Sequence, residues 1–298
     1  MHRIQPVEDY HYKQNMKSIV DQDKVEQYRR EGYMLAEGLF SKDETTKLRE
    51  YFTDMVERGG DGWAEGGVDS TSDDPLKRYP RLLQPHRGDE VAMDFMVDDR
   101  IRQWLTAFYD REPYAVQTMI YFKPPGARGQ ALHQDQRYLR AEPGTCMAAW
   151  LALEDIDEEN GCMSVVSGTQ DIPMLCPGTA DSTQSFTGDQ VPLPREATPI
   201  PMIMKEGDVL FFNGSLVHGS GPNNSDTRFR RIIVGHYIEG DSDKVAHYYF
   251  PVYRFDRSTV EGIEENPWGG GPCGVLVDKD GKEIIQMTGD MEAAMAAH

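Results

Sequence analysis

The pattern of apolar residues changes at Pro113, and this change constrains the fold more than any other feature of the chain. Beyond it, short apolar runs alternate with turn residues, and no helical periodicity lies between them. Strands spaced in this way favour an antiparallel sandwich or jelly roll over a parallel sheet. The expected strands cover residues 114–123, 146–153, 163–167, 208–213 and 231–238.

The chain before Pro113 shows helical patterns instead. Ser41 and Glu44 have the spacing of a capping box, in which each side chain satisfies a backbone amide, so a helix should begin there. The apolar face of that helix would consist of Leu48, Tyr51, Phe52 and Met55. Two more helices are expected over 23–30 and 98–108, and the apolar stretch at 32–36 could enter a sheet.

A chain of 298 residues can bury a large core and could form one large domain or two ordinary ones; we expect one domain over residues 1–298. Its parts would be an N-terminal extension (1–22), a helical part (23–112), a jelly-roll core (113–238) and a C-terminal covering segment (239–298). The covering segment includes a Gly-rich turn at 268–272. Residues 59–75 are typical of a mobile loop, and the long Pro-, Thr- and Ser-rich stretch 171–200 is typical of a lid or binding loop.

The net charge of -19 opposes approach to nucleic acid or to an anionic membrane surface, so we expect neither as a partner. No stretch approaches the roughly 20 apolar residues of a membrane span, and the N-terminus lacks the apolar run of a secretory signal. These features predict a cytoplasmic protein.

The four cysteines show no Cys-X-X-Cys spacing and are interpreted as free thiols in a reducing compartment: Cys146, Cys162, Cys176 and Cys273. No sequence feature marks an oligomeric interface.

His133 and Asp135 are the first candidate metal ligands. On a strand, residues two apart lie on the same face, so both side chains could reach one ion. The alternative is a surface strand with a polar face. The position favours the metal site, because the pair follows a strand that ends at Lys123 and opens the β region.

His218 is the candidate third ligand. An apolar strand delivers it into a Gly- and Ser-rich turn, where an imidazole has room to reach a metal, although a lone histidine at a strand end is more often a hydrogen-bonded structural residue. Two histidines and one carboxylate form a facial triad, which is typical of non-heme Fe(II) oxygenases. The coordination positions left open are those that a bidentate oxo-acid and dioxygen require.

Arginines follow His218 along the next strand. An arginine that points into an apolar barrel needs a carboxylate partner, which its fork can hold bidentately, and the far carboxylate of 2-oxoglutarate fits that role. We favour Arg230 for it, because strand alternation places Arg230 with Ile232 and not with Arg231. Arg228 and Arg231 are interpreted as solvent-facing charges of an edge strand.

Several motifs, taken in order, resemble the phytanoyl-CoA dioxygenase family of Fe(II)/2-oxoglutarate oxygenases over about residues 25–236. Each motif alone is unspecific, whereas the ordered series is specific. The matching segments are 31–41, 123–126, 132–135, 149–154, 159–163 with 167–169, and 218–221 with Asn223, Ser225 and Arg230. The resemblance implies a mainly β fold with flanking helices around a double-stranded β-helix core, the cupin-like jelly roll.

The resemblance also implies roles for individual residues. His133, Asp135 and His218 would bind iron, and Arg230 would pair with the distal carboxylate of 2-oxoglutarate. Ser220, Trp150 and Met119 match positions that line the co-substrate pocket in the family. Two departures matter: the loop before Arg230 is one residue longer than usual, which makes Arg228 a rival, and Gln170 stands where the family often has histidine. Related halogenases carry a small residue in place of Asp135, so halogenation is not expected.

The expected function is therefore that of a dioxygenase that uses Fe(II), 2-oxoglutarate and O2 to oxidise, by default hydroxylate, a small molecule such as a secondary metabolite, with release of succinate and CO2. The alternative is a redox-neutral cupin-like metalloenzyme or a small-molecule binding module. Candidate substrate contacts are Gln117, Arg137, Arg81 and Gln84. The basic cluster of Lys77, Arg78, Arg81 and Arg87 could hold an acidic group of the substrate, or could be a solvated surface patch.

Overall fold

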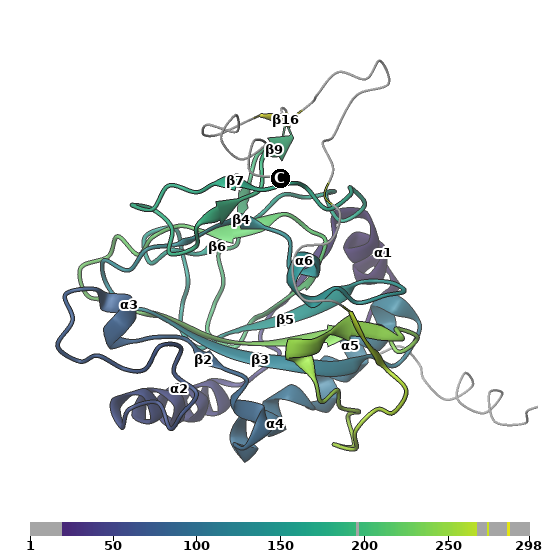
Figure 1. Cartoon of the computed structure of the whole chain (residues 1–298), viewed down its shortest axis with the longest axis horizontal. Helices are drawn as coiled ribbons and strands as arrows, with labels where there is room; N and C mark the ends of the chain where they lie inside the picture. Colours follow the sequence, from purple (N-terminus) through teal and green to yellow (C-terminus); the bar gives the residue numbers. More distant parts are fainter. Residues whose placement is uncertain (1–19, 195–196, 267–272, 274–284, 287–298) are drawn as a thin grey trace, which may run out of the picture.

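A computed structural model describes residues 20–194, 197–266, 273 and 285–286 (Figure 1). Most of the expected N-terminal extension and the Gly-rich turn at 268–272 lie outside these residues. Within them, two antiparallel sheets form the walls of a jelly roll, which confirms the mainly β fold with flanking helices. The strand order is β1-β11-β5-β13-β3-β2 in the larger sheet and β10-β6-β12-β4 in the smaller one.

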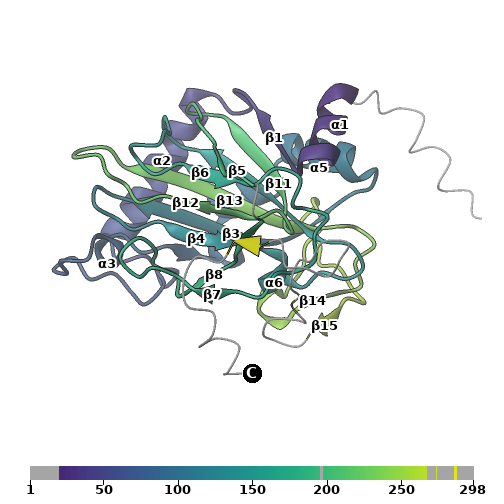
Figure 2. The same cartoon turned by 90° about the horizontal axis from the view of Figure 1, so that it is seen from above.

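The larger sheet contains the longest strands. Its members are β1 (Tyr33–Ala36), β11 (Val209–Asn213), β5 (Cys146–Ala152), β13 (Arg230–Ile238), β3 (Tyr114–Lys123) and β2 (Leu82–Leu83). The smaller sheet lies over it, as the two views agree (Figures 1 and 2), and consists of β10 (Ile200–Pro201), β6 (Met163–Val165), β12 (His218–Ser220) and β4 (Gln130–His133). Every expected strand is therefore present, with ends that shift by at most two residues.

Helices cover the outer face of the larger sheet. The main ones are α1 (Gln22–Glu31), α2 (Lys42–Glu57), α4 (Glu90–Met96) and α5 (Asp99–Tyr109), with a short α3 (Pro75–Arg78) and the 3-10 turn η1 (Pro85–Arg87) between them. Figure 1 shows α2 and α4 below this sheet, on the side away from the smaller sheet. The capping box at the start of α2 is confirmed: Glu44 N donates to Ser41 Oγ, and Ser41 N donates to Glu44 Oε2.

Strand alternation divides the apolar residues between two cores. Phe211 and Ile233 pack under the helices, whereas Phe212, Ile232 and Val234 point between the sheets. Both faces of the larger sheet are covered, so its strands appear in the sequence as nearly continuous apolar runs. β13 lies between β5 and β3, so the interpretation of Arg231 as an edge-strand residue is wrong. Arg231 pairs with Glu154 on the helical side of the sheet.

The stretch 171–200 contains the short strands β7 (Gly178–Thr179), β8 (Asp189–Gln190) and β9 (Leu193–Pro194). Backbone hydrogen bonds attach it to β4: Val191 N donates to Leu132 O, and Phe186 N donates to Gly129 O. Beyond the core lie α6 (Gln136–Leu139), β14 (Lys244–Ala246), the 3-10 turn η2 (His247–Tyr249), β15 (Glu264–Asn266) and β16 (Ile285–Gln286).

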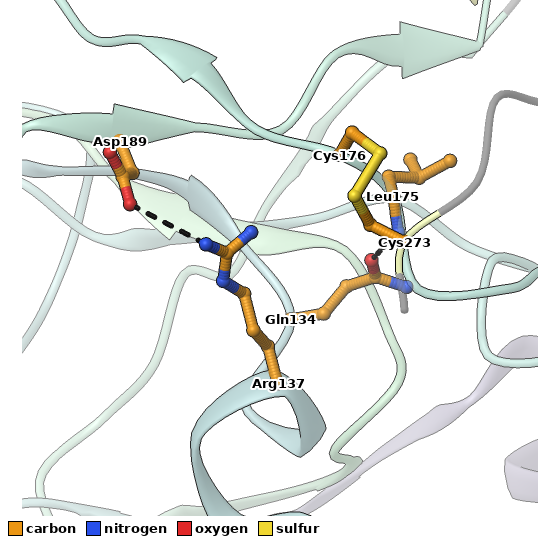
Figure 3. The surroundings of a disulfide bond; sticks show 6 residues. All are labelled: Gln134, Arg137, Leu175, Cys176, Asp189 and Cys273. Atoms are coloured by element: carbon orange, nitrogen blue, oxygen red, sulfur yellow. Dashed lines mark hydrogen bonds and ion pairs between the residues drawn. A yellow bond between two sulfur atoms is a disulfide. The ribbon is translucent and has the colours of Figure 1, made fainter. Parts of the chain in front are cut away.

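Two of the cysteines form a disulfide, so the expectation of four free thiols is wrong. Cys176, in the 171–200 stretch, bonds to Cys273 across 97 positions, with the two Cα atoms 4.8 Å apart (Figure 3). A motif such as Cys-X-X-Cys identifies only cysteines that are close in sequence. Cys176 and Cys273 are far apart in sequence, and the fold brings them together. Cys146 and Cys162 are free, as expected, and both are buried. Among the described residues, no helix is both long and apolar enough to cross a membrane.

Candidate metal centre

His133, Asp135 and His218 lie together between the two sheets. A ligand atom from each residue lies within 4.8 Å of the other two, and all three residues are buried. His133 Nε2 is 3.4 Å from Asp135 Oδ1, and His218 Nε2 is 3.6 Å from Asp135 Oδ2. One correction concerns how the first pair arises. β4 ends at His133, and Asp135 already has helical backbone angles before α6, so a turn, and not strand alternation, brings the two side chains together.

Backbone carbonyls orient both imidazoles. Nδ1 of His133 donates to Ala131 O at 2.8 Å, and Nδ1 of His218 donates to Leu216 O at 2.9 Å, because a carbonyl oxygen can only accept. The lone pair of each ring therefore lies on Nε2, the atom that faces Asp135. This arrangement is how metal-binding histidines are held in one tautomer.

Burial and neighbouring charges set the protonation of the centre. Burial alone would raise the pKa of Asp135, but the neighbouring histidines, with His218 foremost, outweigh burial and hold the pKa well below its usual range. Burial, with help from His133, lowers the pKa of His218 to about 4. An ionised carboxylate beside neutral imidazole is the donor set that a divalent metal of the first transition row requires.

His236 is a buried neighbour that the sequence reasoning missed. It lies on β13, and its Nε2 is 3.1 Å from Asp135 Oδ2, whereas its Nδ1 has no hydrogen-bond partner. Strand alternation could have identified His236 from the sequence. Every second residue of β13 from Arg230 to His236 lies on the same face of the strand. Continuing the alternation from Arg230 would have placed His236 in the barrel.

A small pocket adjoins the three candidate ligands. Met119, Trp150, Ser220 and Arg230 all line it, as the sequence predicts for a common pocket. Arg230 is only 3% exposed, its Nε has no hydrogen-bond partner among the described residues, and its guanidinium lies 5.3 Å from the centre of the Trp150 ring. Burial lowers the pKa of Arg230 to about 10. A buried guanidinium of this kind is suited to a carboxylate ligand.

The rival arginine lies elsewhere. Arg228 is near the surface, where it pairs with Asp157 at 2.7 Å and with Glu159 at 3.1 Å. Arg228 is absent from the lining of the pocket, whereas Arg230 is part of it. Gln170 is also remote from the pocket, and its Nε2 donates to the carbonyls of Arg29 and Arg30.

A larger cavity of about 550 Å³ opens beside the small pocket. Of the four candidate substrate contacts, Gln117, Arg81 and Arg137 line it. Gln84 does not, because its side chain is buried behind the wall and donates to Tyr248 O. The stretch 171–200, expected to be a lid or binding loop, contributes Thr187 and Asp189 to the wall. Several phenol rings complete it: Tyr121, Tyr138, Tyr248 and Tyr249.

The charged groups of this cavity are paired with each other. Arg81 forms two hydrogen bonds with Glu65, both at 2.7 Å, whereas Arg137 lies 3.8 Å from Asp189 (Figure 3). The other members of the basic cluster are not in its wall: Arg78 donates to Ser72 O, and Arg87 donates to Tyr248 O. The predicted cluster therefore contributes only Arg81 to this cavity.

The chain matches a known protein family. The sequence model of the family "Phytanoyl-CoA dioxygenase (PhyH)" matches residues 28–232. Peroxisomal phytanoyl-CoA dioxygenase of Rattus norvegicus is 25% identical over 235 residues, which cover 74% of this chain and 68% of that protein. Phytanoyl-CoA dioxygenase domain-containing protein 1 of Danio rerio is 26% identical over 273 residues, which cover 76% of this chain and 92% of that protein.

Solved structures share the fold. The non-heme monooxygenase ThoJ superimposes with a TM-score of 0.60 at 18% identity, covering 84% of this chain and 89% of that one. The epimerase SnoN, in complex with Fe3+, alpha ketoglutarate and nogalamycin RO, gives a TM-score of 0.58 at 18% identity and covers 85% and 95%. The carbocyclase SnoK from nogalamycin biosynthesis gives 0.58 at 20% identity and covers 76% and 86%.

Proposed function

The chain belongs to the phytanoyl-CoA dioxygenase family of Fe(II)/2-oxoglutarate-dependent dioxygenases, and we propose that it hydroxylates a small organic molecule. One oxygen atom of O2 would enter the product, and the other would enter succinate as 2-oxoglutarate loses CO2. The observation that carries this proposal is the coexistence, in one buried pocket, of a facial triad and an arginine without a carboxylate partner among the described residues.

His133, Asp135 and His218 would hold the iron. Their donor set of two imidazoles and one carboxylate fits Fe(II). Bound iron would supply the activation of dioxygen, which no amino-acid side chain provides. The protein's own contribution is to fix the three ligands through backbone hydrogen bonds and to enclose them between two sheets.

Arg230 and Ser220 would bind the distal carboxylate of 2-oxoglutarate, with Trp150 and Met119 as apolar walls of the same pocket. Arg230 has no competing acid within ion-pair distance among the described residues, so its guanidinium is available to an incoming carboxylate. Arg230 and the three candidate ligands are buried, and low exposure to water strengthens electrostatic interactions of this kind.

The larger cavity would take the substrate. Among the described residues of its wall, the two arginines, Arg81 and Arg137, each lie beside an acid, and the tyrosines offer aromatic faces together with hydroxyl groups. We therefore favour a compact, oxygenated secondary metabolite over a coenzyme A thioester, whose phosphates require unpaired basic side chains. The loosely held Arg137 could accept one carboxylate of such a substrate in place of Asp189.

A redox-neutral cupin-like enzyme or a binding module remains the alternative use of the same three ligands. It gives no role to Arg230, whose burial without a carboxylate partner is costly unless an anion binds there.

The test is succinate release by purified protein supplied with Fe(II), 2-oxoglutarate and O2 across a panel of oxygenated metabolites, small acids and acyl-CoA thioesters. The proposal requires a panel member that stimulates succinate release and yields a product heavier by one oxygen atom, with the label taken from 18O2. Asp135→Ala should abolish both signals, and Asp157→Ala, on the surface, should retain them. Product formation without 2-oxoglutarate, or with zinc in place of iron, would support the alternative.

A further inference from the structure

Lys123 and Arg230 are directly opposite each other on the neighbouring antiparallel strands β3 and β13. Lys123 is 2% exposed and Arg230 is 3% exposed. Neither forms an ion pair with a carboxylate of the described part of the chain. Like charges opposite each other on a sheet are destabilising, and buried charges without a counterion are more so. A cost of this kind is characteristic of a functional site.

All three N–H groups of the Lys123 ammonium already have acceptors. Nζ donates to Gly221 O at 2.6 Å, to Ser220 Oγ at 2.9 Å and to Gly161 O at 3.2 Å. An ammonium has three donors and no acceptor. Lys123 therefore has no donor left for a ligand, and it does not line the small pocket beside the metal centre. Any effect of Lys123 on a ligand of that pocket must pass through another residue.

Ser220 is that residue. Its Oγ accepts from Lys123 Nζ at 2.9 Å and from Gln130 N at 3.3 Å, so both of its lone pairs are used. The hydroxyl hydrogen is then the remaining hydrogen-bonding capacity of Ser220. Because Ser220 lines the pocket together with Arg230, this hydrogen can be donated to a carboxylate bound by the guanidinium.

We propose that Lys123 is a positioning residue for 2-oxoglutarate: it fixes and polarises Ser220 so that the hydroxyl donates to the same distal carboxylate that Arg230 binds. This inference rests on the proposed function. Burial, followed by the charge of Arg230, lowers the pKa of Lys123 well below its usual range, and a carboxylate bound by Arg230 would favour the ammonium form of Lys123 by offsetting the charge of that guanidinium.

The test is an anaerobic titration of the Fe(II)-loaded protein, in which the visible charge-transfer absorption of the iron chelate reports the Kd of an oxo-acid. Two oxo-acids are compared. 2-Oxoglutarate has the distal carboxylate, and 2-oxobutyrate chelates iron through the same groups without it. Lys123→Met should raise the Kd of 2-oxoglutarate about 10-fold or more, which is the scale of a lost charge-assisted hydrogen bond. The Kd of 2-oxobutyrate should stay unchanged. Lys47→Met, at an exposed position of α2, is the matched control.

A double-mutant cycle with Ser220→Ala identifies the route. If Lys123 acts through Ser220, Lys123→Met should add little to the loss already caused by Ser220→Ala. Additive losses, an unchanged Kd for 2-oxoglutarate, or equal weakening of both oxo-acids would each overturn the inference. If Lys123→Met does not fold, Lys123→Gln, which keeps an N–H donor, should show a smaller loss with the same selectivity. A wild-type protein that gives no absorption with either oxo-acid would instead refute the proposed function.

Discussion

His133 and His218 occupy paired positions on the antiparallel strands β4 and β12, and their ring centroids lie 4.2 Å apart. The ladder of the smaller sheet therefore sets the separation of two candidate ligands independently of any metal. Asp135 joins them through the turn that begins α6. A site whose ligands are fixed by backbone pairing is preorganised, so metal binding should require little rearrangement of the chain.

His236 should affect iron affinity although it is not one of the three candidate ligands. Its Nε2 lies 3.1 Å from Asp135 Oδ2 and holds that carboxylate in place. Loss of such a supporting contact typically weakens metal binding by about 10- to 100-fold. We expect this range for His236→Leu in a competition titration with an Fe(II) chelator, and no change for the exposed His247→Leu. Equal affinities of wild type and His236→Leu would contradict this role.

Arg230 and Arg228 provide a matched pair of substitutions. Arg230→Met removes a buried partner of the co-substrate carboxylate, and truncation of such a pair costs roughly 2–5 kcal/mol, or about 30-fold to several thousand-fold in Kd. Arg228→Met removes a surface ion pair and should change the Kd of 2-oxoglutarate less than about 2-fold. The check is the Kd of each variant by anaerobic titration. Similar losses in the two variants would refute the assignment.

The disulfide between Cys176 and Cys273 should contribute to stability. It closes a loop of 97 positions, and a cross-link of that length stabilises the folded state by about 2–4 kcal/mol, mainly by restricting the unfolded chain. Reductant should therefore lower the urea midpoint of wild type, whereas Cys176→Ser should start at the lower midpoint and not respond to reductant. A wild-type midpoint that reductant leaves unchanged would contradict this expectation.

His86 should make stability depend on pH. Burial, with help from the charge of Arg87, lowers the pKa of His86 from an ordinary value of 6.5 to about 3. Because the folded-state pKa lies below the unfolded-state value, the unfolded chain binds the extra proton between these two pH values, and stability falls as pH falls through that window. We expect the free energy of unfolding of His86→Leu to fall less steeply than that of wild type, and that of His247→Leu to follow wild type. Parallel pH profiles for wild type and His86→Leu would exclude this role for His86.

The sequence predicts local features well and long-range partners poorly. The capping box of Ser41 and Glu44 depends on residues three positions apart, and the strands depend on alternation within a few residues, so both are visible in the sequence. The contact between His236 and Asp135 joins residues 101 positions apart, and the disulfide joins residues 97 positions apart. These pairs exist only because the sheets bring distant segments together.

In the candidate site, too, the sequence predicts residues of local motifs and does not predict long-range partners. His133, Asp135, His218 and Arg230 lie in short motifs whose order can be compared with a family, so each could be named from the sequence. The position of Lys123 opposite Arg230 depends on the register of β3 against β13. No local motif in the sequence predicts that register. The substrate cavity is formed by loops and by a C-terminal turn, whose packing has no periodic signal.

The central claim is that one pocket holds iron and 2-oxoglutarate together, and anaerobic absorption spectroscopy tests it most directly. Addition of Fe(II) and 2-oxoglutarate to the metal-free wild-type protein should produce a visible charge-transfer band that neither component gives alone. Asp135→Ala should not produce it, and Asp157→Ala should. A wild-type protein that binds Fe(II) and shows no band with saturating 2-oxoglutarate would contradict the claim.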